Sequence, residues 1–398
     1  MNKPISTRAH EETTRQEGLR TLLPVLFAFF IMGFCDAVGI ASNYVKQDFG
    51  LTDVEANYLP SMVFIWFFVF SVPVGLLMNK IGRKSTVLIS MVLTIIAMII
   101  PYVFYNYPMT LFAFALLGIG NTILQVSLNP LLASVVSANK LTSSLTAGQF
   151  VKAVSSFCAP IIASVAAAHF GNWKLMFPIF ALVSLLSSLW LIYTPIAEIK
   201  QQQTSISFFK TFGLLRNKTI LMFFLGILFI VGVDVGINTV SAKLLMTRCN
   251  LPLNEAGYAT SLYFVFRTLG AFAGAFLLVK VSAVKFFRVT IFIAAVALSI
   301  LIFAQSEWLI LTLIGVIGFT CANVFSIIFG AAIQQLPAKA NEISGLMIMG
   351  VSGGAVIPPL MGLFTEQMNS LIGALLVIGF CMAYLLLLSI MQKEKKVS

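Results

Sequence analysis

The sequence predicts an all-α membrane protein with twelve transmembrane helices, and three observations support this fold class. The 398 residues are 59% hydrophobic and only 10% charged, whereas a soluble domain has about 25% charged residues. Apolar runs of about 20 residues, the length that crosses a bilayer as a helix, recur twelve times. Most charged residues fall in the short segments between these runs.

Each predicted span is an apolar run bounded by polar or charged residues, Gly or Pro. The loops between the spans are short, which leaves no room for an appended soluble domain. The spans are predicted at 21–45, 55–78, 85–105, 109–134, 143–168, 174–194, 218–244, 256–279, 288–306, 308–335, 343–365 and 369–391.

The basic residues predict how the spans are oriented. The net charge is +11, but 19 of the 25 Lys and Arg residues lie on one side of the predicted membrane and four on the other. Cytoplasmic loops carry the excess of positive charge, so we expect both termini in the cytoplasm. The charge therefore reports topology, and nucleic acid is not an expected partner.

Two halves of the chain contain related apolar segments. Residues 31–40 read IMGFCDAVGI and residues 230–237 read IVGVDVGI, so Asp36 and Asp234 occupy matching positions. A charged side chain within a span costs roughly 2.5–3.5 kcal/mol on insertion, so a functional role is its default interpretation. Repeated halves with polar groups near the midplane are typical of secondary transporters. We predict an N-terminal six-helix half at 1–194, a cytoplasmic linker at 195–217 and a C-terminal six-helix half at 218–398.

Several protein classes find no support in the sequence. The polar N-terminus does not resemble a cleavable signal peptide. The five Cys residues are scattered, which predicts neither a disulfide framework nor a metal site. His10 and His169 are the two histidines, and no nucleophile–base arrangement stands out. We expect no enzymatic activity, no cofactor and no metal.

A short loop after the second predicted span carries the most specific motif. Residues 75–84 read GLLMNKIGRK, in which glycines permit a tight turn and basic residues favour the cytoplasmic side. This loop resembles the signature of the major facilitator superfamily, Gly-x-x-x-Asp-Arg/Lys-x-Gly-Arg-Arg/Lys, with an amide in place of the family's Asp. The resemblance implies the major facilitator fold, with two pseudo-symmetric six-helix bundles. The signature residues are Gly75, Asn79, Lys80, Gly82, Arg83 and Lys84.

Within that superfamily the chain resembles the fucose permease, or sugar:proton symporter, group. Three segments carry this resemblance: residues 51–78 in the second span, 120–130 in the fourth and 349–362 in the eleventh. The resemblance implies proton-coupled transport of a sugar.

The chain departs from that group at the positions that matter for coupling. The group's essential Asp of span one matches a position near Gly39, about one turn after Asp36. Its Glu of span four is Gln125 here, which cannot titrate. Its Gln-x-x-Asn of span five ends in Lys152, and its Gly-Arg-Phe of span eight lacks the Arg, with Arg267 one turn away. The coupling residues therefore cannot be transferred directly.

Four charged side chains lie near the middle of predicted spans: Asp36, Lys152, Asp234 and Arg267. Pairing offsets most of the cost of burying them, so we expect Asp36–Lys152 and Asp234–Arg267 pairs, each within one half. Arg keeps its proton, so Asp234 should stay ionised. Asp36 and Lys152 are the predicted proton-coupling residues. The alternative is that both pairs only hold helices together.

Polar side chains also follow single faces of several spans. Asn121, Gln125 and Asn129 are four residues apart and share a helix face, as do Lys152 and Ser156. Amides and aromatic rings suit a sugar pocket, although interhelical hydrogen bonds would explain them too. The predicted cavity residues are Asn43, Asn121, Gln125, Asn129, Gln149, Asp234, Asn238, Tyr263, Arg267 and Asn323.

These observations predict a secondary active transporter that moves a small polar solute by alternating access. The favoured hypothesis is proton-coupled symport of a monosaccharide such as fucose, glucose or galactose, by a monomer in the bacterial inner membrane. Two alternatives stay open: an organic-anion carrier or drug-type exporter of the same superfamily, and a transporter-like sensor that binds solute without moving it.

Overall fold

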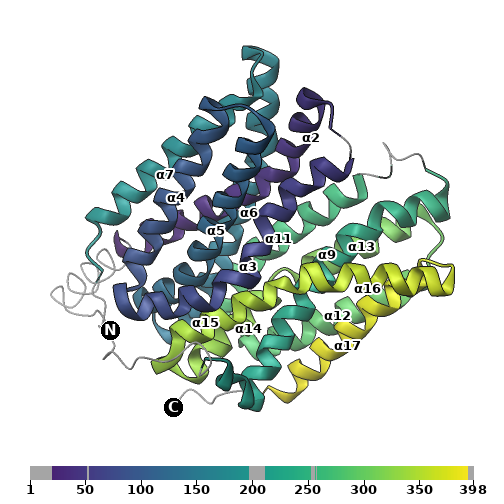
Figure 1. Cartoon of the computed structure of the whole chain (residues 1–398). Coiled ribbons are helices and arrows are strands. Elements are labelled where there is room, and N and C mark those ends of the chain that lie inside the picture. The colour runs from purple at the N-terminus through teal and green to yellow at the C-terminus, as the bar shows by residue number, and fades with distance from the viewer. Residues whose placement is uncertain (1–19, 52, 197–210, 252–255, 257, 393–398) are drawn as a thin grey trace, which may run out of the picture. The chain divides into compact units, whose positions relative to one another are not determined.

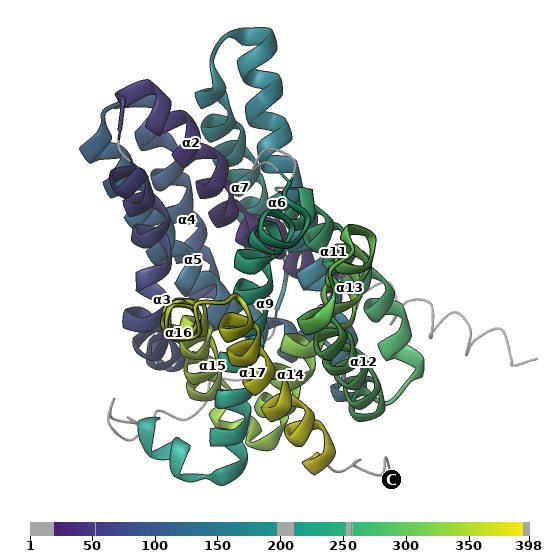
Figure 2. The same ribbon diagram turned by 90° about the vertical axis from the view of Figure 1, so that its right-hand side faces the viewer.

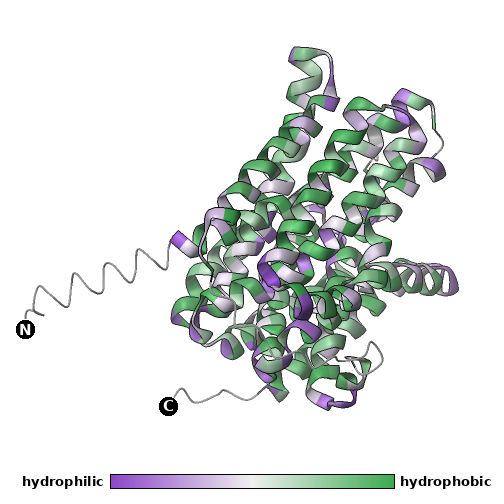
Figure 3. Ribbon diagram, turned by 60° about the vertical axis from the view of Figure 1, so that its left-hand side comes forward, coloured by the Kyte–Doolittle hydropathy of each residue, from purple (hydrophilic) through white to green (hydrophobic). Residues whose placement is uncertain are grey.

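Twelve helices in the computed structural model are long and apolar enough to cross a membrane. The structure describes residues 20–392 except 52, 197–210, 252–255 and 257, and these residues contain helices but no strand (Figure 1). Hydrophobic residues cover most of each helix (Figure 3). The predicted all-α fold with twelve spans is confirmed.

The first six spans account for the N-terminal half of the sequence. The first span runs over Arg20–Phe49 and ends in α2 (Val38–Phe49). Short 3₁₀ turns precede the fifth and sixth spans. The remaining helices of this half are α3 (Asp53–Ile81), α4 (Arg83–Val103), α5 (Tyr107–Val135), α6 (Leu141–Phe170) and α7 (Met176–Tyr193).

The last six spans account for the C-terminal half. Two of them are interrupted, the tenth between α13 and α14 and the eleventh at a 3₁₀ turn, Gly350–Ser352. The eleventh span begins at Pro337, not at residue 343 as predicted, so Glu342 lies within this helix. The helices are α9 (Lys218–Cys249), α11 (Tyr258–Lys280), α12 (Ala283–Phe303), α13 (Glu307–Cys321), α14 (Val324–Gln335), α15 (Ala340–Met349), α16 (Gly353–Met368) and α17 (Ile372–Met391).

The chain forms two compact units. Unit 1 comprises residues 1–144, 151–208 and 338–345, and unit 2 comprises 145–150, 209–337 and 346–398. In unit 1, α4 packs against α5 and α7, and α3 packs against α5 (Figure 1). In unit 2, α9 packs against α16 and α17, and α13 packs against α11 and α12 (Figure 2). The predicted linker at 195–217 falls mostly on 197–210, outside the described residues.

The two matching carboxylates lie on different kinds of backbone. In the first span, α-helical residues 20–32 lead into a 3₁₀ turn, η1 (Gly33–Ala37), which is followed by α2. Asp36 is part of this turn. In the seventh span, α9 runs unbroken past Asp234. A 3₁₀ stretch in the middle of a helix often marks a functional hinge. The first span has such a stretch at its carboxylate, and α9 has none at Asp234.

Candidate functional site

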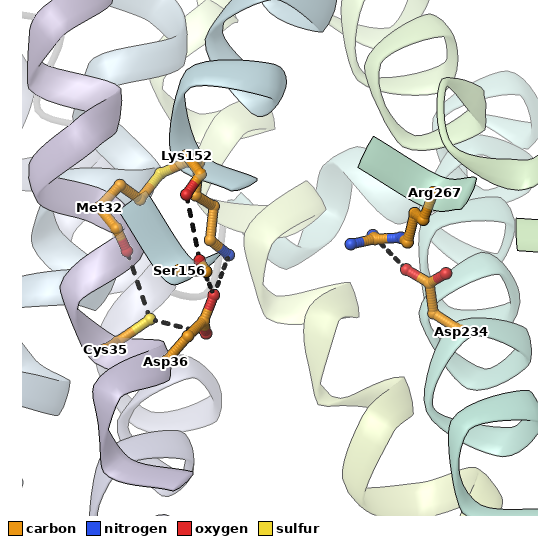
Figure 4. Close-up of polar contacts among 7 residues, drawn as sticks. All are labelled: Met32, Cys35, Asp36, Lys152, Ser156, Asp234 and Arg267. Atoms are coloured by element: carbon orange, nitrogen blue, oxygen red, sulfur yellow. Dashed lines mark hydrogen bonds and ion pairs between the residues drawn. The ribbon is translucent and has the colours of Figure 1, made fainter. Parts of the chain in front are cut away.

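Asp36 is the centre of a polar cluster in unit 1 (Figure 4). Ser156 Oγ donates a hydrogen bond of 2.6 Å to Asp36 Oδ2. Lys152 Nζ lies 3.8 Å from the same oxygen. The Cys35 thiol, 3.3 Å from Asp36 Oδ1, also lies 3.3 Å from the Met32 carbonyl oxygen. The predicted Asp36–Lys152 pair is present. The same carboxylate oxygen, Oδ2, accepts the Ser156 hydrogen bond and is the atom nearest the Lys152 ammonium.

Close packing of η1 on α6 creates this cluster. A Cβ atom at Gly33 would lie 2.6 Å from the Lys152 carbonyl oxygen and 2.7 Å from Ser155 Cβ. Real Cβ contacts are not that short, so only glycine lets the two helices approach this closely. The same approach brings Asp36 within reach of Lys152 and Ser156.

The Asp36–Lys152 pair is only partly buried. The exposed fractions of the Lys152 and Asp36 side chains are 23% and 35%. Both residues sit mid-way along their spans, where a charged group facing lipid would be costly and normally faces the bundle interior or a water-filled cavity. Their partial exposure in mid-span is the arrangement expected of charged groups that line a water-filled cavity.

Asp234 is held more firmly in unit 2. The Tyr263 hydroxyl donates a hydrogen bond to Asp234 Oδ1, and Arg267 Nη2 donates one to Asp234 Oδ2. Tyr263 and Arg267 are four residues apart on α11 and share one face. The Tyr263 side chain is buried, and the Asp234 side chain is only 17% exposed. The predicted Asp234–Arg267 pair is thus present (Figure 4), and each carboxylate oxygen has its own hydrogen-bond donor.

The predicted amide stripe lies on the buried face of α5. Asn121, Gln125 and Asn129 are all less than a tenth exposed. Asn129 Nδ2 donates to the Gln125 carbonyl oxygen of its own helix at 2.8 Å. Neither amide atom of Asn121 has a hydrogen-bond partner in the structure, and this amide lies near the Cys35 thiol. Asn121 is therefore the member of the stripe that lies next to the Asp36 cluster.

Asn323 fastens two helices of unit 2 together. It occupies the interruption between α13 and α14, and its Nδ2 donates to the Gly270 carbonyl oxygen at 2.9 Å. A Cβ at Gly274 would lie 2.2 Å from Asn323 Oδ1. Gly270 and Gly274 therefore admit the amide between the helices, the close approach expected of a Gly-x-x-x-Gly face.

The other predicted cavity residues are less informative. Gln149 and Asn238 are half-buried, and the Asn238 carbonyl oxygen accepts a hydrogen bond from Thr260. Gln149 belongs to unit 2 and Lys152 to unit 1, although both lie on α6. The Asn43 side chain lies outside the described part of the structure.

The signature loop is tied to the start of α15 within unit 1. Asn79 accepts a hydrogen bond from Asn341 Nδ2 and donates one to Glu342 Oε1, both at 2.7 Å. Arg83 Nε donates to Asn341 Oδ1 at 2.7 Å, and its Nη1 donates to the Pro130 carbonyl oxygen at 3.1 Å. The amide that stands in place of the signature Asp therefore contacts a carboxylate from another helix, that of Glu342.

The remaining signature residues play backbone roles. Gly82 has φ +87°, which favours glycine. A Cβ at Gly75 would lie 2.8 Å from the Asn341 carbonyl oxygen. Lys84 Nζ donates to the Ile192 and Thr194 carbonyl oxygens, at 2.9 Å each, and so caps the end of α7. The Lys80 residue is exposed.

Sequence reasoning missed several partners. Ser156 shares a helix face with Lys152, one turn away, and that spacing could have identified it as a member of the Asp36 cluster. Nothing in the sequence singles out Cys35 as a neighbour of the carboxylate. The contacts of Tyr263 and Glu342 depend on which helices pack together, which spacing within one helix does not reveal.

The twelve spans, the internal repeat and the buried charge pairs define a multi-pass integral membrane protein of the secondary transporter class. Residues 25–242, more than half of the chain, match the Major Facilitator Superfamily. The chain belongs to this superfamily, and the proteins it resembles are transporters, not enzymes.

Curated relatives match nearly the whole chain at low identity. A glucose/galactose transporter of Brucella abortus is 23% identical over 402 residues, which is 96% of this chain and 96% of that protein. A putative glucose/galactose transporter of Helicobacter pylori is 26% identical over 364 residues, covering 86% of this chain and 88% of that protein.

Solved structures share the fold. The E. coli fucose:proton symporter aligns with a TM-score of 0.83 at 16% identity, over 94% of this chain and 98% of that one. The human organic anion transporter MFSD10 aligns with a TM-score of 0.72 at 12% identity, over 94% and 99% of the two chains. The predicted resemblance to the fucose permease group is confirmed at the level of fold.

Proposed function

We propose that this protein imports a monosaccharide together with a proton, by alternating access, and that Asp36 is the residue that takes up the proton. The curated relatives are glucose/galactose transporters, and the E. coli protein with the same fold is a fucose:proton symporter. These likenesses favour a sugar over the other solutes of the superfamily.

The environment of Asp36 carries the proposal. Its side chain is 35% exposed in the middle of a span, and it lies on a 3₁₀ turn that can act as a hinge. The Nζ atom of its cationic partner, Lys152, lies 3.8 Å from Asp36 Oδ2, an ion-pair distance longer than that of a hydrogen bond. A proton can reach this carboxylate, and neutralising it would weaken the attraction between the first and fifth spans.

Asp234 fits a different role. Both of its oxygens have donors, and one donor is an Arg, which keeps its charge at all accessible pH values. Asp234 therefore anchors α9 to α11. Arg267 side-chain atoms remain 37% exposed, so Arg267 is available as a solute contact in unit 2.

The transport cycle follows from the repeat. The N-terminal half, residues 1–194, and the C-terminal half, residues 218–398, alternate in opening toward the two sides, joined by the linker at 195–217. The polar residues predicted above line the cavity. The protein lies in the bacterial inner membrane with both termini in the cytoplasm, and it works as a monomer. A proton moving down the membrane potential contributes about 2.3 kcal/mol per 100 mV, which is enough to accumulate a neutral solute tens of times.

Uptake into proteoliposomes with an imposed pH gradient tests the proposal. We expect one or more labelled monosaccharides to accumulate when the outside is acidic, and accumulation to collapse when a protonophore removes the gradient. A sodium gradient at constant pH should have no effect. Accumulation driven by sodium alone, or monosaccharide binding without counterflow, would contradict the proposal; the second result would favour a sensor.

A further inference from the structure

We propose that the transported sugar carries a carboxylate, and that Lys152 binds this carboxylate when Asp36 takes up the proton. This inference rests on the proposed function and specifies its substrate class. It is carried by the charge balance of the Asp36 cluster and by the direction in which its donors point.

Charge balance is the first argument. With Asp36 ionised and Lys152 protonated, the cluster has no net charge. One proton on Asp36 leaves the cluster with a charge of +1 in the middle of a span, where an uncompensated charge is costly. A solute with one negative charge restores neutrality, so the loaded site has the same net charge as the empty one. A neutral sugar would leave the +1 charge in place.

The second argument is geometric. Ser156 Oγ and Lys152 Nζ lie 2.6 and 3.8 Å from a single atom, Asp36 Oδ2. A hydroxyl and an ammonium that converge on one carboxylate oxygen make a site that also fits the carboxylate oxygen of a solute. Protonation removes the negative charge of Asp36 and so weakens its hold on both donors. The 23% exposure of the Lys152 side chain gives a solute access to it.

The charge pair in the described part of unit 2 is arranged differently. Arg267 donates to Asp234 Oδ2, and Tyr263 donates to Asp234 Oδ1. Both oxygens of that carboxylate are already hydrogen-bonded, and its side chain is only 17% exposed, against 35% for Asp36. We therefore assign the exchange of a carboxylate partner to Lys152.

Matched ligands test this inference on the full-length protein. The acids are galacturonate, glucuronate and a nine-carbon sugar acid. Each acid is compared with its neutral methyl ester, and the first two are also compared with their parent hexoses. The readouts are the rise in apparent Tm of the purified protein at pH 5.5 and 7.5, and uptake into proteoliposomes under an imposed pH gradient. At least one acid should raise the Tm, more at pH 5.5, and should accumulate, while its ester does neither.

The possible outcomes separate the two proposals. Accumulation of hexoses or methyl esters without any acid overturns the sugar-acid inference and leaves proton-coupled sugar import standing. Failure of every sugar, acidic or neutral, to bind or accumulate overturns both proposals.

Variants of Lys152 identify the residue responsible. Lys152→Met should reduce the preference for acid over ester at least ~10-fold, a loss of about 1.4 kcal/mol, while Lys152→Arg should keep it because the charge remains. Lys140→Met, an equal change at an exposed position just before α6, should leave the preference unchanged. Asp36→Asn, which holds the position neutral, should bind the acid equally well at both pH values. An unchanged preference in Lys152→Met overturns the inference.

Discussion

Asp36 and Asp234 occupy the same place in the two halves of the repeat, yet their surroundings differ in three ways. Asp36 lies on a 3₁₀ turn and Asp234 on an unbroken α-helix. The Asp36 side chain is 35% exposed and that of Asp234 17%. Asp36 meets a hydroxyl, a thiol and a distant ammonium, whereas Asp234 is hydrogen-bonded to a phenol and a guanidinium. The duplicated sequence position is thus more exposed and more loosely held in the first half than in the second, which is the contrast on which the proposed roles rest.

Other parts of the repeat have kept a shared role. Lys84 at the start of α4 caps the last carbonyls of α7, and Arg288 near the start of α12 lies against the carbonyls of Ser389 and Gln392 at the end of α17. These caps hold equivalent helix ends in place in both halves. These helix ends therefore have similar contacts in both halves, whereas the surroundings of the two carboxylates differ.

Asp234→Asn gives the largest expected loss of stability. Removing one charge of a buried pair leaves the other uncompensated, and breaking such pairs costs up to about 3–5 kcal/mol, less when the partner is partly exposed as Arg267 is. We expect the apparent Tm of the purified protein to fall by roughly 5 °C or more.

The same change at Asp36 is the matched comparison. Asp36→Asn should lower the apparent Tm clearly less, because its partner is 3.8 Å away and the site is more exposed. Equal losses for the two variants would show that the two carboxylates are equivalent anchors.

Gly33→Ala tests whether close packing of η1 on α6 builds the site. The added methyl would lie 2.6 Å from the Lys152 carbonyl oxygen, and overpacking of this kind costs about 1–3 kcal/mol. We expect a lower Tm and weaker proton-driven uptake. In Gly39→Ala, the added methyl has no atom within 4 Å, so its Tm should match that of the parent. A drop in Tm of the same size in both variants would contradict the packing argument.

Ser156→Ala gives the smallest expected effect. The hydroxyl donates a hydrogen bond of 2.6 Å to Asp36 Oδ2, and one such bond at a partly exposed site contributes about 0.5–1.5 kcal/mol. We expect a small fall in the apparent Tm and slower proton-driven uptake. The neighbouring Ser155 hydroxyl is buried without a hydrogen-bond partner, and Ser155→Ala should leave both measurements unchanged. Identical results for the two variants would remove Ser156 from the site.

Physical reasons explain which features of the fold and the site could be predicted from the sequence and which could not. Span number and helix class follow from runs of apolar residues, because an uncovered polar backbone cannot cross a bilayer. The two ion pairs could be predicted because four mid-span charges must find partners. The 3₁₀ turn at Asp36 could not be predicted, because it depends on how closely Gly33 approaches α6. The contact between Asn79 and Glu342 depends on which helix packs against the signature loop, and a local motif does not show that either.

The most direct test of the account is the transport behaviour of Asp36→Asn in proteoliposomes. We expect Asp36→Asn to lose accumulation driven by a pH gradient and to retain solute counterflow. A permanently neutral side chain cannot carry a proton, but it can still allow solute on the two sides of the membrane to exchange. Glu366→Gln, an equivalent change at an exposed position, serves as the control and should accumulate solute normally. Full proton-driven accumulation by Asp36→Asn would contradict the account.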